Sequence, residues 1–254
     1  MVAFSLTIAG ALGIVLTGGY LWWEMGRYTT PQVVESRFDE RRMIFAYTLG
    51  LFVGILLSLP WLLYLAAMTN AALLGAFALL AVLVVSIELA EWATRRTHYW
   101  GRGPSFPFYA IGLRAGIGGI LVLALAGQYL SASTITWDGT FVVGLQAVAI
   151  VALEVTGALL SLPETAAGSP RRGAGVVSGA LISGIGLFLL GFNAFGGELV
   201  GGVAAAIVLM GSIYLYRRTR VILDHIPPPS LVGSPAPVAP GGRYGRKDRG
   251  PPSR

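Results

Sequence analysis

Two glutamates three residues apart, Glu88 and Glu91, lie near the end of an apolar run over residues 71–93. Residues at this spacing share one face of an α-helix. A rise of about 1.5 Å per residue places Glu88 roughly 8 Å inside the end of the run. Arg95 follows Glu91 by four residues, which is the favourable order for an ion pair on one helix. We therefore interpret Glu91 and Arg95 as a structural ion pair at the helix end.

Two more ionisable residues lie at a similar depth in the next two apolar runs. Arg114 lies about two turns inside the run 107–130, and Glu154 lies about two turns before the end of the run 140–162. A charge facing lipid is costly, so Glu88, Arg114 and Glu154 are expected to face the bundle interior and to meet partners there. Two carboxylates and one guanidinium leave one negative charge, which a proton or a bound cation would neutralise. The pattern predicts a site for a proton, a cation or a polar solute, or else a bridge that only fixes helix packing.

The composition indicates that these residues belong to a membrane protein. Hydrophobic residues make up 55% of the 254-residue chain and charged residues 12%, a balance that a soluble core does not need. Seven apolar runs are long enough to cross about 30 Å of hydrocarbon as helices. They lie near residues 2–23, 43–65, 71–93, 107–130, 140–162, 174–195 and 199–217. The predicted fold is an all-α bundle of seven transmembrane helices within residues 1–223.

The distribution of basic residues predicts the orientation of the bundle. Arginines lie in the first, third and fifth connections and after the seventh run, whereas the second, fourth and sixth connections contain no Lys or Arg. The positive-inside rule makes the basic connections cytoplasmic. The N-terminus is then outside and the C-terminus is cytoplasmic, as in a multi-pass protein of the plasma membrane.

Residues 224–254 differ from the rest of the chain because they are rich in Pro and Gly and are basic. Such a segment cannot bury a core, so we predict a disordered cytoplasmic tail. It is interpreted as a solvated tail, a polyproline ligand at Pro237–Pro240, or a contact with anionic lipid headgroups. The residues expected to contact anionic lipid are Arg217, Arg218, Arg220, Arg243, Arg246, Lys247 and Arg249.

Pairs of glycines four residues apart predict close helix packing, because two backbones can approach where side chains are absent. The pairs are Gly112 with Gly116, Gly175 with Gly179, and Gly197 with Gly201. Packing inside the bundle is the preferred interpretation, and a dedicated dimer face is the alternative.

A short internal match raises the question of a repeat. GILLSLP at 54–60 recurs as GALLSLP at 157–163. Two repeats of three helices each would be inverted relative to one another, as in many secondary transporters. The match is short and consists of common membrane residues, so we interpret it as a coincidence.

Several chemistries are excluded by residue types. The chain has no cysteine, and its two histidines, His98 and His225, lie outside the apolar runs. Thiol catalysis, thiolate metal sites and a haem held between transmembrane histidines are therefore not predicted, and no metal or cofactor is expected. Seven helices with an outside N-terminus are similar in layout to the microbial rhodopsins. A retinal Schiff base needs a lysine in the last helix, and the run 199–217 has none.

Two functional hypotheses remain from the sequence. The first is a small transporter or channel-like protein whose Glu88, Arg114 and Glu154 handle a proton, a cation or a polar solute. The second is a non-catalytic anchor or scaffold subunit that holds a membrane protein partner or forms a homo-oligomer. An enzyme is not predicted, since no nucleophile–base pair is apparent, and the basic residues follow the membrane surface and do not suggest nucleic acid.

Overall fold

The structure, a computed structural model, describes residues 2–29, 36–70, 72–97, 105–131, 136–161, 172–191 and 193–226, without the side chains of 2–7, 172–174 and 193–196. Within these ranges the chain forms helices and no strand, which confirms the all-α prediction. The long helices are α1 (Val2–Met25), α2 (Glu40–Thr69), α3 (Leu73–Arg96), α4 (Phe106–Ser131), α5 (Trp137–Leu160), α6 (Arg172–Gly191) and α7 (Asn193–Thr219). Two short helices, η1 (Gly26–Tyr28) and α8 (Val221–Asp224), follow α1 and α7.

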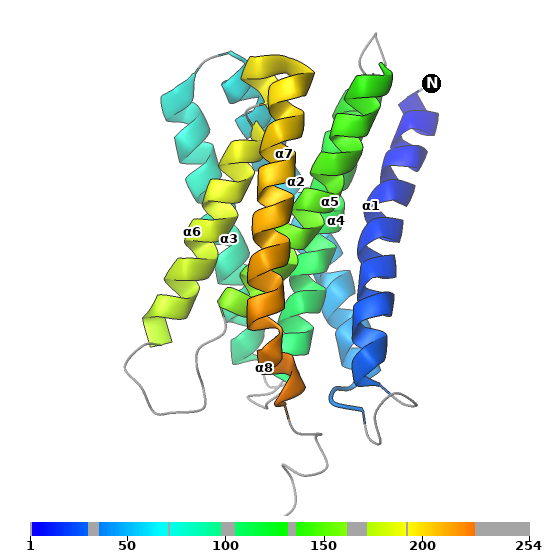
Figure 1. The fold of residues 1–254 in the computed structure, drawn as a ribbon, viewed down its shortest axis with the longest axis vertical. Coiled ribbons are helices and arrows are strands. Elements are labelled where there is room, and N and C mark those ends of the chain that lie inside the picture. The colour runs from blue at the N-terminus through cyan, green and yellow to red at the C-terminus, as the bar shows by residue number, and fades with distance from the viewer. Residues whose placement is uncertain are drawn as a thin grey trace, which may run out of the picture.

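The long helices run side by side in one bundle, with the N-terminus at one end and α8 at the other (Figure 1). Among the described residues, five helices are long and apolar enough to cross a membrane, namely α2, α3, α4, α5 and the stretch Gly197–Asp224. Helix α6 contributes a shorter apolar stretch, Gly175–Gly191. Large apolar side chains such as Leu56 and Leu74 are exposed on the bundle surface, as the hydrocarbon of a bilayer requires.

Helices α4 and α5 form the centre of the bundle. Most of their apolar residues are buried, whereas most of those on α2, α3 and α7 face outward. Helix α4 packs against α1, α2 and α5, and α5 packs against α4, α6 and α7. Arg114 on α4 and Glu154 on α5 are each completely buried in this centre. We call the end that carries the arginine-rich connections the inner end and the opposite end the outer end.

Glycines bring α4 close to its neighbours. A Cβ at Gly116 would collide with the backbone oxygen of Tyr47 on α2, and one at Gly50 would collide with the backbone of α4. Gly112 of the same predicted pair lies against Met43. The close approach predicted for this pair is thus an α2–α4 contact inside the bundle.

The outer connection between α6 and α7 agrees with the prediction in part. The expected break at 196–198 is present as a kink with non-helical backbone at Gly197, whereas α6 already ends at Gly191 and α7 begins at Asn193. Gly197 has φ of 70°, a conformation that glycine adopts without strain, and a Cβ there would meet nothing within 4 Å. Gly197 therefore forms the kink, and its predicted packing contact is not among those that the structure shows. Gly201 is buried.

The C-terminal boundary also differs from the prediction. Leu223 and Ile226 are buried in the core at the inner end, together with Tyr28 and Phe38. The ordered fold therefore continues to residue 226, three residues into the predicted tail. Residues 227–254, with Arg243, Arg246, Lys247 and Arg249, lie outside the described residues.

Candidate functional site: an arginine buried among three glutamates

Arg114 is completely buried near the inner end of α4. It lies eight residues from the start of that helix, which is about 12 Å of helix length. Because α4 is surrounded by other helices, the guanidinium cannot reach the membrane surface as a peripheral arginine does. It must find its hydrogen-bond acceptors inside the protein.

Two of these acceptors come from α3. Arg114 donates from Nε to Oε2 of Glu91 at 2.7 Å, and from Nη2 to Oε1 of Glu88. Glu91 is buried, and the side chain of Glu88 is 11% exposed. One face of α3 thus presents both carboxylates to one guanidinium, as the spacing of three residues allows.

Two serines supply the other hydrogen bonds. Arg114 donates from Nη2 to Oγ of Ser161 at 2.9 Å, and from Nη1 to Oγ of Ser183 on α6 at 3.2 Å. Ser161 directly follows the last residue of α5, and its hydroxyl also lies 3.3 Å from Oε2 of Glu88. Side chains from α3, α4 and α6 and from the end of α5 therefore converge on the guanidinium.

Glu154 is the third carboxylate and is held differently. Its Oε2 lies 3.6 Å from Nη1 of Arg114, which is an ion-pair distance but too long for a hydrogen bond. The side chain is completely buried, and neither carboxylate oxygen has a hydrogen-bond partner among the described residues. Glu154 is thus the least satisfied member of the cluster.

Small residues make room for this arrangement. A Cβ at Gly157 would lie 2.8 Å from Nη1 of Arg114 and 2.7 Å from the hydroxyl of Ser183. At Gly179 on α6 a Cβ would collide with the hydroxyl of Ser161, and at Gly118 it would touch Glu154. Gly179, from one of the predicted pairs, therefore packs α6 onto α5 beside the site.

The charges of the cluster do not balance. Glu88, Glu91 and Glu154 surround one buried guanidinium, and Arg95 is the only other described cation that pairs with any of them. Arg95 lies 3.7 Å from Oε1 of Glu91, and its side chain is 28% exposed. Even with Arg95 included, three carboxylates face two cations. A buried unpaired charge is costly, so the cluster favours one additional positive charge.

A metal centre does not fit this arrangement, because the guanidinium occupies the space among the carboxylates. No group of three acidic or histidine side chains in the described ranges has the geometry to hold a metal ion. A proton fits better, because it adds to a carboxylate oxygen without displacing Arg114. A small cation beside Glu154 is the other way to supply the charge.

The structure brings Glu88, Arg114 and Glu154 together at the depth expected from the sequence. The predicted ion pair of Glu91 with Arg95 is present, but Glu91 also accepts the Nε hydrogen bond of Arg114. The interpretation of Glu91 as a helix-end residue was therefore incomplete. Its spacing from Glu88 was the signal that could have revealed this role. The sequence offered no comparable signal for Ser183.

A second buried carboxylate, Glu24 at the inner end of α1, was not predicted. It lies 3.7 Å from Nη1 of Arg27 and 3.5 Å from Nε of Arg220 at the end of α7. Arg220, which was expected to contact lipid, is partly exposed and pairs with this buried carboxylate. Arg217 and Arg218 of the same predicted set are exposed.

The contacts around Glu24 continue into the inner connections. Tyr28 donates to Oδ1 of Asp224 at 3.1 Å, and Arg37 donates from Nη1 to the carbonyl of Leu223 at 3.0 Å. Burial, together with the negative charge of Asp224, raises the pKa of Tyr28 to about 12. These contacts hold the connection after α1 against α8 at the inner end of the bundle.

The fold and the site define the class of this protein: it is an all-α, multi-pass membrane protein with a charged cluster buried among four of its helices. No protein-family model, no curated protein sequence and no solved structure matches the chain.

Proposed function

We propose that this protein is a small membrane transporter in which the cluster of Glu88, Glu91, Arg114 and Glu154 takes up and releases a proton or a small cation. The observation that carries this proposal is the state of Glu154. It is completely buried, lies 3.6 Å from the guanidinium, and has no hydrogen-bond partner among the described residues. A carboxylate that accepts no hydrogen bond gains a proton at less cost than one whose charged form is stabilised by hydrogen bonds.

The position of Arg114 supports uptake and release of a proton or a small cation by the cluster. Its guanidinium touches Glu88, Ser161 and Ser183, which belong to three different elements. A change in the charge of Glu154 alters the attraction between α5 and α4. Because Arg114 also binds side chains of α3 and α6, the same change alters the contacts of those helices. Coupling of this kind between a protonation step and helix positions is what proton-driven transport requires.

The first experiment tests proton binding without knowledge of the substrate. The pH-dependent infrared difference spectrum of purified protein in lipid nanodiscs should contain a protonated-carboxyl band from a buried site. Replacing Glu154→Gln should remove that band, because glutamine has nearly the same shape and no titratable proton. Glu198→Gln is the control, since Glu198 is exposed at the outer end and accepts a hydrogen bond from Thr136.

The second experiment separates a proton from a cation. Vesicles containing the protein would be loaded with a pH-sensitive dye, and proton entry would be followed under an imposed potential with Na⁺, K⁺ or a large organic cation outside. A proton site predicts the same flux in each solution, whereas a cation site predicts flux that depends on the ion. In both cases Glu154→Gln should reduce the flux to that of protein-free vesicles.

An unchanged carboxyl band and an unchanged flux in Glu154→Gln would remove the cluster from any transport mechanism. The cluster would then be a packing device, as in the anchor or scaffold hypothesis. Purification in a mild detergent would in that case be expected to recover a partner protein in fixed stoichiometry.

We also propose that the protein lies in the plasma membrane with its inner end toward the cytoplasm. Arg217 and Arg218 are exposed at the inner end of α7, where they can contact anionic lipid headgroups. This orientation can be tested with tags placed at the two termini of the chain. The access of a protease or a thiol reagent to each tag is compared between intact cells and inverted vesicles.

A further inference from the structure

A second set of buried polar groups lies in the outer half of the bundle, outside the arginine cluster. Trp61 on α2 and Gln146 on α5 are each only 1% exposed. The indole Nε1 of Trp61 and the amide Oε1 of Gln146 have no hydrogen-bond partner among the described residues. One is a donor and the other is an acceptor.

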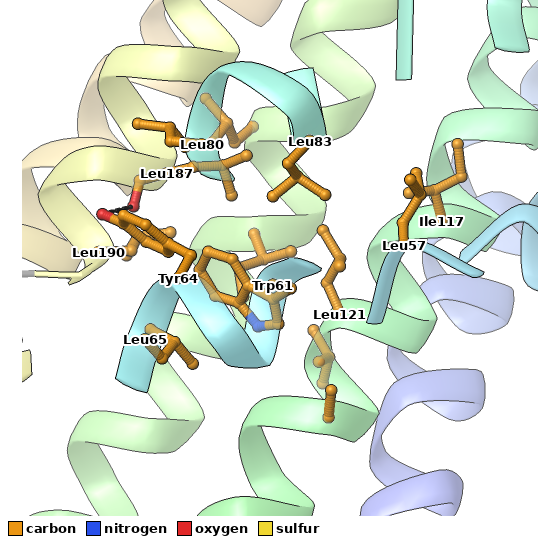
Figure 2. Close-up of a cluster of buried hydrophobic side chains, with 14 of the residues drawn as sticks. Leu57, Trp61, Tyr64, Leu65, Leu80, Leu83, Ile117, Leu121, Leu187 and Leu190 are labelled. Carbon is orange, nitrogen blue, oxygen red and sulfur yellow. Dashed lines mark hydrogen bonds between the residues drawn. The ribbon is translucent and has the colours of Figure 1, made fainter. Parts of the chain in front are cut away.

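Both residues are linked to the outer end of α6, Gln146 directly and Trp61 through Tyr64. Tyr64 donates its hydroxyl toward the carbonyls of Leu187 at 3.3 Å and of Phe188 at 3.2 Å, and Gln146 donates from Nε2 to the carbonyl of Leu190 at 3.4 Å. Trp61 stacks on Tyr64 with ring centroids 5.5 Å apart. Figure 2 shows the Tyr64 hydroxyl directed at Leu187, with Trp61 beside it.

The end of α6 adds further acceptors at this place. Helix α6 ends at Gly191, and the carbonyls of the last turn of a helix have no intrahelical donor. Gln146 lies nine residues from the outer start of α5, about 14 Å along that helix. Polar backbone therefore occurs well inside the bundle, where Tyr64 and Gln146 donate to it and where the free polar atoms of Trp61 and Gln146 also lie.

An apolar layer separates this set from the arginine cluster. On α5, Ile150 lies one turn from Gln146 and one turn from Glu154. On α6, Leu187 lies one turn from Ser183. Both side chains are fully buried, as is Leu83 on α3 in the same core. A layer of this kind blocks water and ions unless the helices move apart.

We propose that Trp61, Gln146 and the last turn of α6 form an outer water-binding site, which water enters from the outer face and which the apolar layer separates from the arginine cluster. Water suits both free groups, because it accepts a hydrogen bond from Trp61 Nε1 and donates one to Gln146 Oε1. The proposal that water occupies this site depends only on the contacts and burial described above. Its role as the outer part of a transport route rests on the proposed function.

The lack of native cysteine makes a direct test straightforward. Gln146→Cys and Ile150→Cys would be exposed to a small cationic thiol reagent applied to the outer face of intact vesicles. Such reagents react with the thiolate, and a thiolate forms only where water reaches the sulfur. Gln146→Cys should therefore react about tenfold faster than Ile150→Cys. Equally slow reaction at both positions would overturn the outer site, and equally fast reaction would overturn the apolar layer.

A second measurement uses the unmodified protein and so does not depend on the folding of a variant. Hydroxyl radicals generated by X-ray radiolysis oxidise side chains that lie next to bound water. Trp61 should be oxidised despite its burial, whereas Phe108, which is equally buried at the inner end, should not. Protection of Trp61 equal to that of Phe108 would count against the site. The flux of Glu154→Gln is measured independently, so failure here leaves the proposed function standing.

Discussion

Arg114 donates its Nε hydrogen bond to Glu91 at 2.7 Å, in the interior of the bundle and one helix away along the chain. This contact makes Glu91 a member of the charged cluster and not simply a partner of the nearby Arg95. It also places two carboxylates of α3 on one side of the guanidinium and Glu154 of α5 on another.

Replacing Arg114→Gln should strongly destabilise the protein. Three carboxylates, two of them buried, would lose their shared cation, and breaking a buried ion pair from one side costs about 3–5 kcal/mol. Arg114→Lys should be only slightly better, because an ammonium group cannot reproduce the forked contacts to Glu88, Glu91 and the two serines. Thermal unfolding in detergent measures the loss. Arg218→Gln, at an exposed site, is the control and should unfold like the wild type.

The two contacts of Glu91 should differ in strength. Glu91→Ala leaves the buried Nε of Arg114 without an acceptor, which costs about 1–3 kcal/mol. Arg95→Gln removes a partly exposed pair at 3.7 Å and should cost less than about 1 kcal/mol. Equal losses of stability in the two variants would show that the helix-end pair is the main role of Glu91.

The close approach of α2 and α4 should depend on Gly116. In Gly116→Ala the added methyl group would meet backbone atoms of Tyr47 and Leu51, which cannot rotate away, so we expect a loss of about 1–3 kcal/mol. Gly144→Ala is the matched control. Gly144 lies on α5 with open space around it, and alanine there should be neutral or stabilise by up to about 1 kcal/mol. Chemical denaturation of both variants against wild type measures the difference.

The contact between η1 and α8 should be visible in the titration of Tyr28. Its pKa is raised to about 12, first by burial and then by Asp224, so Asp224→Asn should lower that pKa toward the ordinary value of 10.0. The folded pKa lies above the ordinary one, so this stabilising contribution is complete below pH 10 and is lost as the pH rises through 12. Ultraviolet titration of wild type, Asp224→Asn and Tyr28→Phe isolates the component. A Tyr28 component that ionises at the same pH with and without Asp224 would exclude the contact.

Much of the fold was predictable because it depends on residues that are neighbours in the sequence. Each span is a continuous apolar run, so seven helices followed from the hydrophobic length that a bilayer requires. The lack of cysteine, and of any histidine within the apolar runs, excluded whole classes of chemistry in the same way. The ends of α6 and α7 were less predictable, because a glycine-rich apolar stretch can continue as a helix or turn. At Gly197 only the backbone dihedral decides.

The sequence predicts the height of the site residues along their helices, but not which way their side chains point. Counting residues along a helix gives the height of a side chain in the membrane, so Glu88, Arg114 and Glu154 were expected at one level. The rotation of a helix about its axis is set by packing, and a helix that is apolar on every side carries no sequence signal for the buried face. For this reason the hydroxyl of Ser183 could not be assigned to the guanidinium.

The sequence by itself determined the membrane class, the number of helices and the level at which charged residues meet, since these follow from composition and from distance along the chain. Only the tertiary structure decided that Glu91 binds Arg114 and that Glu154 lies beside the guanidinium without a hydrogen bond. It also decided that Gln146 and Tyr64, on which Trp61 stacks, donate to carbonyls at the outer end of α6. These relationships join residues on different helices. They depend on how the helices rotate and approach one another, which glycines such as Gly116 and Gly179 permit only in the assembled bundle.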